Sequence, residues 1–191
     1  MYQKALRGYY SDTSSSESFI WKKNHDIATV QMGIALAMEE TNQTAFSYFF
    51  NKKALNFFIN YYPESVNTVV TAINLCAACN RSGYYDEALY YGEFADSVFN
   101  ADYNVDDLFM VYYYILSEGG TAYLNQKNYE LAQTKFKELV KLTEKYYDGD
   151  NSSCALPYSK LAESYYRINQ PDSSLYYYEK ALALVPQDIE T

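Results

Sequence analysis

Glycine and proline are scarce in this sequence, with 7 glycines and 4 prolines among 191 residues. Both residues are the usual markers of tight turns, and an all-β fold needs many such turns. Apolar residues make up 49% of the chain, so the chain can bury a core and is not disordered as a whole. The composition therefore predicts an all-α fold of long helices joined by short links.

Cysteine and histidine are also few, with Cys76, Cys79, Cys154 and His25 as the whole set. An odd number of cysteines does not suggest a disulfide framework, and it favours reducing surroundings. The CxxC pair can place two thiols on one side of a helix, which metal or redox chemistry would require. Both cysteines also fall on an apolar helical stripe, so core packing is the favoured interpretation. We expect His25 on the surface, and we predict neither a metal site nor a cofactor.

Motifs of common active sites are absent, since no G-x-S-x-G, P-loop, HExxH or GxGxxG occurs. No apolar run approaches the roughly 20 residues that span a bilayer, and residues 1–10 lack the plan of a signal peptide. We therefore predict that the chain is not an enzyme. The cytoplasm is the favoured compartment, with a periplasmic sensor domain as the alternative.

Positive charge is also in short supply, with 15 Lys and Arg against 24 Asp and Glu and a net charge of −9. An acidic surface repels phosphate backbones and anionic lipid headgroups. We therefore expect the partner of this segment to be a protein or a peptide, and neither a nucleic acid nor a membrane.

Internal repetition is the strongest positive signal in the chain. The last segment, residues 161–186, has small residues and a tyrosine, a short break at Asn169, and then a second apolar stretch. Stretches of the same order surround Gly83 and Gly120, so each unit predicts a helix, a turn and a second helix. The closing small or apolar residues of these helices recur at intervals of 41, 44 and 42 residues, at Ala54, Ala95, Leu139 and Ala181.

These units resemble the tetratricopeptide repeat, which has a small residue and Tyr in its first helix, Gly or Asn at the turn, and then Tyr, Ala, an aromatic residue and a closing Pro. The unit that matches best does so through Ala162, Tyr165, Pro171, Tyr178, Ala181, Leu182 and Pro186. A period of about 42 residues looks like the extended variety found in kinesin light chains and several bacterial regulators.

The resemblance implies a right-handed superhelical array of about four repeats preceded by a partial helix. The expected segments are a tail helix of a preceding repeat at 1–10, a loop at 11–18, and repeats at 25–62, 65–100, 104–147 and 152–186. Because the first helix of the partial repeat would lie before Met1, we expect either a chain cut from a longer protein or an unpaired capping helix.

Local signals refine the turns and helix ends. Gly83 and Asn169 tolerate the left-handed backbone that ends a helix, and Pro171 suits the first turn of the next one. Side chains that can cap the first helices of repeats two to four are Ser65, Asn104, and Ser152 or Ser153.

In families of this kind the first helices line a concave groove, and the resemblance implies a peptide site there. The candidate binding residues are Asn80, Arg81, Tyr114, Thr121, Asn125, Glu163, Tyr166 and Arg167. The arginines would pair with carboxylates, the asparagines would bond peptide backbone, and the tyrosines would pack against side chains. The alternative is that these are solvated residues near helix ends.

We therefore predict a non-catalytic scaffold that binds a protein or a peptide. Tyrosine- and asparagine-rich arrays of this kind resemble the sensory or assembly regions of larger bacterial regulators, such as histidine kinases and helix-turn-helix regulators. The alternative function is self-association, in which end repeats with exposed apolar faces stack on another copy.

Overall fold

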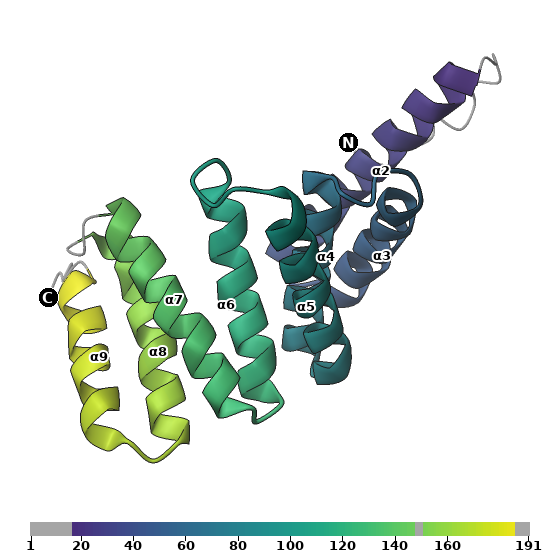
Figure 1. Ribbon diagram of the computed structural model, residues 1–191. Coiled ribbons are helices and arrows are strands. Elements are labelled where there is room, and N and C mark those ends of the chain that lie inside the picture. The colour runs from purple at the N-terminus through teal and green to yellow at the C-terminus, as the bar shows by residue number, and fades with distance from the viewer. Residues whose placement is uncertain (1–16, 148–150, 186–191) are drawn as a thin grey trace, which may run out of the picture. The chain divides into compact units, whose positions relative to one another are not determined.

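Helices account for nearly all of the chain that the computed structural model describes, residues 17–147 and 151–185 (Figure 1). The α-helices are α2 (Glu17–Glu40), α3 (Thr44–Tyr61), α4 (Val66–Ser82), α5 (Tyr85–Asp102), α6 (Phe109–Asn125), α7 (Tyr129–Tyr147), α8 (Ala155–Arg167) and α9 (Pro171–Leu184), with a 3-10 helix, η1, at Ser152–Cys154. No strand occurs within those two ranges, so the predicted all-α fold is confirmed.

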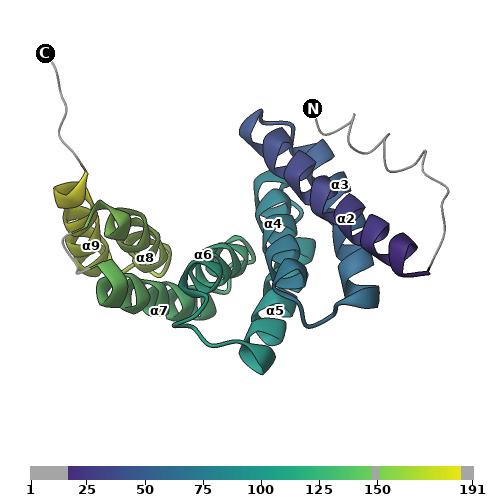
Figure 2. The same cartoon turned by 90° about the horizontal axis from the view of Figure 1, so that it is seen from above.

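Neighbouring helices pack as hairpins, α2 on α3, α4 on α5, α6 on α7 and α8 on α9. Within the two compact units of the chain, unit 1 (1–104) and unit 2 (105–191), the hairpins also pack on one another: α4 contacts α3, and α8 contacts α7. Figure 2 shows α2 beside α3 and α8 beside α9. The second helices α3 and α7 are therefore each covered on two sides by first helices, as stacking of repeats requires.

One turn geometry recurs in all four hairpins. The first residue after α4 and the second residue after α2, α6 and α8 have a positive φ, in chain order Asn42 (59°), Gly83 (78°), Lys127 (61°) and Asn169 (58°). The next residue donates its N–H to a carbonyl five positions back, with N···O distances of 2.7 Å (Gln43 to Met38), 3.0 Å (Tyr84 to Cys79), 2.9 Å (Asn128 to Tyr123) and 3.0 Å (Gln170 to Tyr165). These are Schellman turns, which satisfy the last carbonyls of a helix.

The turn residues lie about 42 positions apart, so the backbone carries the period that the sequence predicted. The left-handed conformations expected at Gly83 and Asn169 are confirmed, and Pro171 is the first residue of α9. Lys127 was not anticipated, because lysine has no intrinsic preference for this conformation.

Small residues lie where the two helices of a hairpin cross. Seven positions before each turn residue come the buried residues Ala35, Cys76, Gly120 and Ala162. Five positions after it come Ser47, Ala88, Ala132 and Ser174, of which the last is the most exposed at 4%. Because these side chains are short, the helix backbones approach closely and the larger core residues Phe58, Phe99 and Phe136 fill the space around them.

Only one of the predicted N-terminal capping residues is confirmed by the structure. Ser65 caps α4 as predicted, with its Oγ accepting a hydrogen bond from the Thr68 N–H at 3.2 Å. Asn104 was predicted to cap the next first helix but caps none, because α6 begins later, at Phe109. In the intervening segment Asp106 binds Lys145 and Tyr146 of α7. The segment that precedes α6 is therefore in contact with α7.

The caps predicted at Ser152 or Ser153 are also wrong. Both serines belong to η1, and Asn151 is the capping residue, accepting a hydrogen bond from the Ser153 N–H at 2.9 Å. At the other end of the chain, α2 begins at Glu17, eight residues before the expected start of the first repeat. The predicted tail helix at 1–10 and most of the predicted loop at 11–18 lie outside the described residues.

Candidate functional site

The predicted binding residues share one side of the first helices. Counted back from the turn residue of each hairpin, they occupy positions 2, 3, 6 and 13, which fall within an arc of about 100° around a helix with 3.6 residues per turn. We call this side the first-helix face. Asn80 and Arg81 belong to the first-helix face of unit 1. The remaining six lie on that of unit 2: Tyr114, Thr121, Asn125, Glu163, Tyr166 and Arg167.

An ion pair joins the two first helices of unit 1. The Arg81 guanidinium on α4 donates to Oε1 of Glu39 on α2, with an Nη2–Oε1 distance of 2.5 Å and an Nε–Oε1 distance of 3.1 Å. The second carboxylate oxygen of Glu39 accepts a hydrogen bond from Ser47 Oγ at 2.9 Å. Glu39 is thus held from two sides, while the Arg81 side chain remains 47% exposed and can share its guanidinium with an incoming carboxylate.

Apolar surface lies beside this ion pair. Leu36, one helical turn before Glu39, is 57% exposed. Asn80 is half-buried, and its Nδ2 lies 3.8 Å from the Cys76 sulfur. The first-helix face of unit 1 therefore combines an exposed aliphatic side chain with a partly exposed guanidinium.

A second contact joins the first helices of unit 2. Lys160 Nζ on α8 donates to Thr121 Oγ1 on α6 at 2.8 Å, and Thr121 Oγ1 donates to the Ser117 carbonyl at 2.7 Å. The stem of Lys160 also brings its ammonium to within 5.8 Å of the Phe136 ring centre. Thr121 therefore serves to anchor Lys160. The sequence pattern missed Lys160, which lies nine positions before its turn residue, where the repeat predicts no groove residue.

Charged and aromatic side chains continue along α8. Arg167 pairs with Glu163 one turn earlier, with an Nη2–Oε1 distance of 3.1 Å, and the neighbouring carboxylate raises the pKa of the guanidinium. Tyr166 is 67% exposed and Tyr114 on α6 is 48% exposed. Leu156, at the N-terminal end of α8, adds a further half-exposed apolar side chain.

Tyr114 has a fixed neighbour. Its ring meets the ring of Tyr113 edge to face, with a centroid distance of 5.3 Å. Burial raises the pKa of the Tyr113 hydroxyl to about 12, so Tyr113 stays protonated at any physiological pH. Tyr113 thus belongs to the packed interior, and Tyr114 supplies the accessible ring.

The cysteines and the histidine are packed against other side chains of their own units. Cys76, Cys79 and Cys154 are buried, and burial raises the pKa of the Cys79 thiol to about 11. His25 was expected on the surface but is half-buried, with edge contacts to Phe58 (6.0 Å) and Tyr62 (5.4 Å), because α2 packs against α3 at this point. Residues 17–147 and 151–185 contain no group of three or more His, Cys, Asp and Glu that can hold a metal ion.

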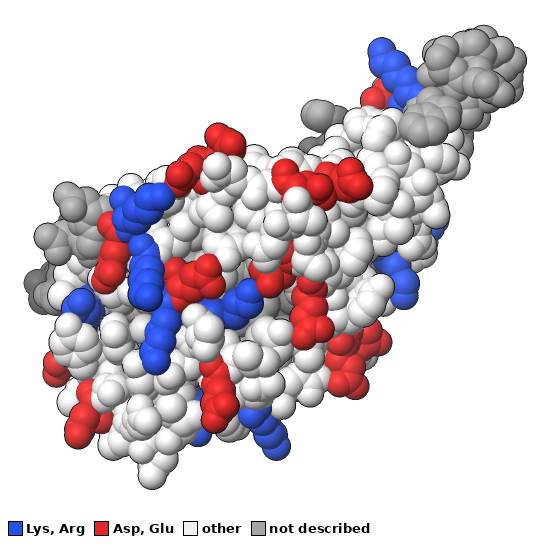
Figure 3. Space-filling view, viewed as in Figure 1, with Lys and Arg blue, Asp and Glu red and all other residues white. Residues whose placement is uncertain are grey.

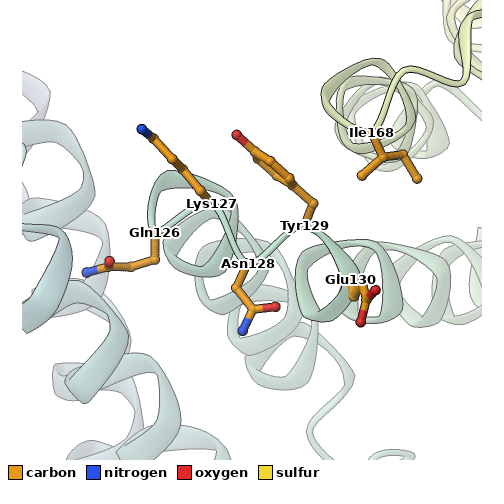
Figure 4. A pocket seen from close by; sticks show the side chains of 6 residues that line it. All are labelled: Gln126, Lys127, Asn128, Tyr129, Glu130 and Ile168. Carbon is orange, nitrogen blue, oxygen red and sulfur yellow. The ribbon is translucent and has the colours of Figure 1, made fainter.

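A shallow hollow of about 460 Å³ lies at the turn between α6 and α7 (Figure 4). Its lining residues are Gln126, Lys127, Asn128, Tyr129, Glu130 and Ile168. Figure 4 shows these side chains pointing in different directions, Lys127 and Tyr129 to one side and Asn128 to the other. The polar groups do not converge, so the hollow lacks the arrangement typical of a small-molecule site.

Repeated hairpins with small residues at their crossings and one common turn define a helical repeat protein. Residues 115–187 match the family model described as tetratricopeptide repeat, which confirms the resemblance predicted from sequence. A search of curated proteins finds no match. Among the described residues no helix has the length and apolar character needed to cross a membrane.

Solved structures share the fold over the whole chain. BtubC (BKLC) from P. vanneervenii has a TM-score of 0.73 at 13% identity, and the match covers 100% of this chain and 75% of that one. TTC0263, a thermophilic TPR protein in Thermus thermophilus, has a TM-score of 0.59 at 19% identity, with 99% of this chain and 86% of that one covered. At such identities the likeness defines the fold alone, which is a tetratricopeptide-type repeat solenoid.

Proposed function

We propose that this chain binds a protein or peptide segment through its first-helix faces. The main support for this proposal is the surface of unit 2. The rings of Tyr114 and Tyr166 are exposed there, on the same two helices as the polar pairs Lys160–Thr121 and Glu163–Arg167. Aromatic residues and arginine are the types enriched at binding hot spots, and rings fixed on helices lose little entropy on binding. The acidic net charge favours a ligand of net positive charge.

Each polar residue has a distinct role in this proposal. Lys160 is held by Thr121 and offers a preorganised cation to a peptide carbonyl or carboxylate. Arg167 carries a carboxylate partner, so a ligand must compete with Glu163 or extend the pair into a network. In unit 1, Arg81 and Glu39 stand in the same relation. The bound segment would therefore be selected by a pattern of charge and apolar side chains rather than by one deep pocket.

Phage selection tests this proposal directly. A library of random peptides is selected against the wild-type chain, and the enriched peptides are measured against Tyr166→Ala. Because Tyr166 is 67% exposed, the substitution leaves the core intact. We expect binding to fall at least about tenfold, the loss typical of a hot-spot residue.

The matched control is Tyr176→Ala, which removes a 52% exposed tyrosine from the second helix α9. Its affinity for the same peptides should equal that of the wild type. Equal binding to the Tyr166→Ala and Tyr176→Ala variants, or no enrichment of any peptide, contradicts the proposal.

We also propose that this scaffold acts as the sensory or assembly region of a larger bacterial regulator. The support is the resemblance of its tyrosine-rich repeats to the arrays attached to histidine kinases and helix-turn-helix regulators. Sequencing the reading frame on both sides of the segment tests this idea, which requires a kinase or DNA-binding domain in the same frame. Self-association is the alternative function, in which end repeats with exposed apolar side chains would stack on another copy.

A further inference from the structure

The first hairpin, α2 with α3, has buried polar residues where the next two hairpins have small or apolar ones. Nine positions after the turn residue, α3 has Asn51, which is 1% exposed, whereas α7 has Phe136. Five positions after the turn residue, Ser47 is fully buried, and Ala88 and Ala132 take its place in α5 and α7. Burying a polar group costs free energy unless it is hydrogen-bonded, so these two residues need a partner.

That partner is the carboxylate of Glu39 on α2. Ser47 Oγ lies 2.9 Å from Glu39 Oε2, and Asn51 Nδ2 donates to Ser47 Oγ at 3.4 Å. An ionised carboxylate only accepts hydrogen bonds, so the single proton of the Ser47 hydroxyl points to Glu39. The other carboxylate oxygen, Oε1, accepts from the Arg81 guanidinium on α4. A chain of hydrogen bonds therefore runs from the core of unit 1 to an exposed cation.

Arg81 is held by one edge of its guanidinium. The two bonds to Glu39 come from Nε and Nη2, and Nη1 takes no part in this ion pair. The Arg81 side chain is 47% exposed, whereas the Glu39 side chain is 21% exposed. A planar guanidinium binds a carboxylate through two parallel hydrogen bonds, and it loses less freedom when its plane is already fixed. The edge that carries Nη1 is therefore oriented for a second carboxylate.

We propose that Ser47 is a positioning residue that fixes Arg81 through Glu39, and that Arg81 in this orientation binds a carboxylate of the ligand. The inference rests on the proposed peptide binding and adds to it a ligand chemistry and a buried residue that selects for it. The bound carboxylate extends the Arg81–Glu39 pair into a network and leaves Glu39 in place. Because one carboxylate is a local requirement, it agrees with a ligand whose net charge is positive.

Nuclear magnetic resonance of the ligand-free chain tests the positioning role. The sequence has three arginines, Arg7, Arg81 and Arg167, so arginine labelled with 15N gives three Nε signals, and Arg81→Lys assigns the one of interest. We expect its order parameter to lie above about 0.6 in the wild type and to fall below that value in Ser47→Ala, as for a flexible group. The reason is that Glu39 loses one of the two bonds that hold it.

Ser174→Ala is the matched control, since Ser174 is the buried residue at the same register of α9, in unit 2. It should leave the Arg81 signal unchanged. Circular dichroism checks that both serine variants are folded, which the alanines at this register of α5 and α7 lead us to expect. Glu39→Gln is a second variant that leaves Ser47 intact, and it should also loosen Arg81.

Binding of the phage-selected peptides tests the ligand chemistry. Each enriched peptide is made again with every Asp and Glu replaced by Asn and Gln, and in a separate arm with an amidated C-terminus. Removal of the bound carboxylate, from a side chain in the first arm or from the chain end in the second, should weaken binding about three- to tenfold, the effect of one net hydrogen bond. Ser47→Ala should weaken binding of the original peptide by a similar factor, and it should not change binding of the peptide that lacks the carboxylate.

The outcomes separate this inference from the proposed function. An Arg81 order parameter that is the same in the wild type and in Ser47→Ala overturns the positioning role. Equal losses in Ser47→Ala for peptides with and without the carboxylate indicate a general structural effect and also overturn it. Peptides that bind equally with and without every carboxylate contradict the ligand chemistry. If no peptide is enriched, the proposed function fails together with the ligand chemistry, while the measurement on the free chain still decides the role of Ser47.

Discussion

Gly120 on α6 lies against the Phe136 side chain of α7. A Cβ at this position would lie 2.5 Å from Cε1 of Phe136, whose side chain is fully buried. We expect Gly120→Ala to lower the free energy of unfolding by about 1–3 kcal/mol, the usual cost of overpacking a core. Urea denaturation followed by circular dichroism measures the change.

The neighbouring glycine is the control for that substitution. A Cβ at Gly119 would meet nothing within 4 Å, so Gly119→Ala gains helix propensity without a clash. It should leave stability unchanged or raise it by up to about 1 kcal/mol. Similar losses in both variants would mean that Phe136 does not restrict this position.

The thiol of Cys79 and the hydroxyl of Tyr113 should make the stability of the fold depend on pH in the alkaline range. Burial raises the pKa of Cys79 from 9.0 to about 11 and that of Tyr113 from 10.0 to about 12. Between those values the folded chain keeps protons that the unfolded chain has lost, so rising pH favours unfolding. We expect the urea midpoint to stay level up to about pH 9 and to fall as pH rises towards 12. A midpoint that stays level to pH 11 would contradict this assignment.

Among the elements, the hairpin turns offer a test that separates backbone conformation from packing. Lys127 holds a φ of 61°, which costs a residue with a side chain about 1–2 kcal/mol relative to glycine. We expect Lys127→Gly to raise the free energy of unfolding by up to about 1 kcal/mol, since glycine also loses more entropy on folding. Lys127→Ala is the control, because it removes the ammonium without relieving φ.

Gly83 provides the converse change at the equivalent position. Its φ is 78° and a Cβ there would meet nothing within 4 Å, so Gly83→Ala alters backbone strain alone. A loss of about 1 kcal/mol is expected from thermal or urea unfolding. If Gly83→Ala proved neutral, the left-handed conformation would not limit the stability of these turns.

Helix positions could be predicted from sequence because their causes are local. Apolar residues at spacings of three and four, with a Gly or Asn between two such stretches, are enough to define each hairpin. The start of α6 could not be predicted, because Asp106 is held by Lys145 and Tyr146, about 40 residues further along. The positive φ of Lys127 could not be predicted for a similar reason. The hydrogen bonds of the turn impose this conformation, and lysine has no intrinsic preference for it.

The candidate site was predictable as a face and not as a set of contacts. Periodicity places Arg81, Thr121 and Tyr166 on the first helices and leaves their partners open. The Arg81–Glu39 pair joins residues 42 positions apart and the Lys160–Thr121 pair joins residues 39 apart, close to one repeat length in each case. Finding such pairs requires the register between neighbouring repeats, which the periodicity within one helix does not give.

For the whole molecule, the negative net charge predicts that polyanions are not binding partners. Figure 3 shows Lys and Arg side chains gathered over α7, with Asp and Glu side chains over much of the same face, and the chain carries a net charge of −9. We expect no retention on heparin and no shift of duplex DNA at physiological salt, because a net negative field repels polyanions. Micromolar, salt-sensitive binding to DNA in a fluorescence anisotropy titration would show that the α7 lysines outweigh the net charge.

The four hairpin turns share a geometry that Asn, Gly, Lys and Asn fill in succession. The pattern of main-chain hydrogen bonds recurs in all four turns, while the residue type at the turn position differs. This accounts for a family model that matches only residues 115–187 while BtubC follows the entire chain at 13% identity. Proteins that share this fold are therefore easier to find by superposing backbones than by aligning sequences.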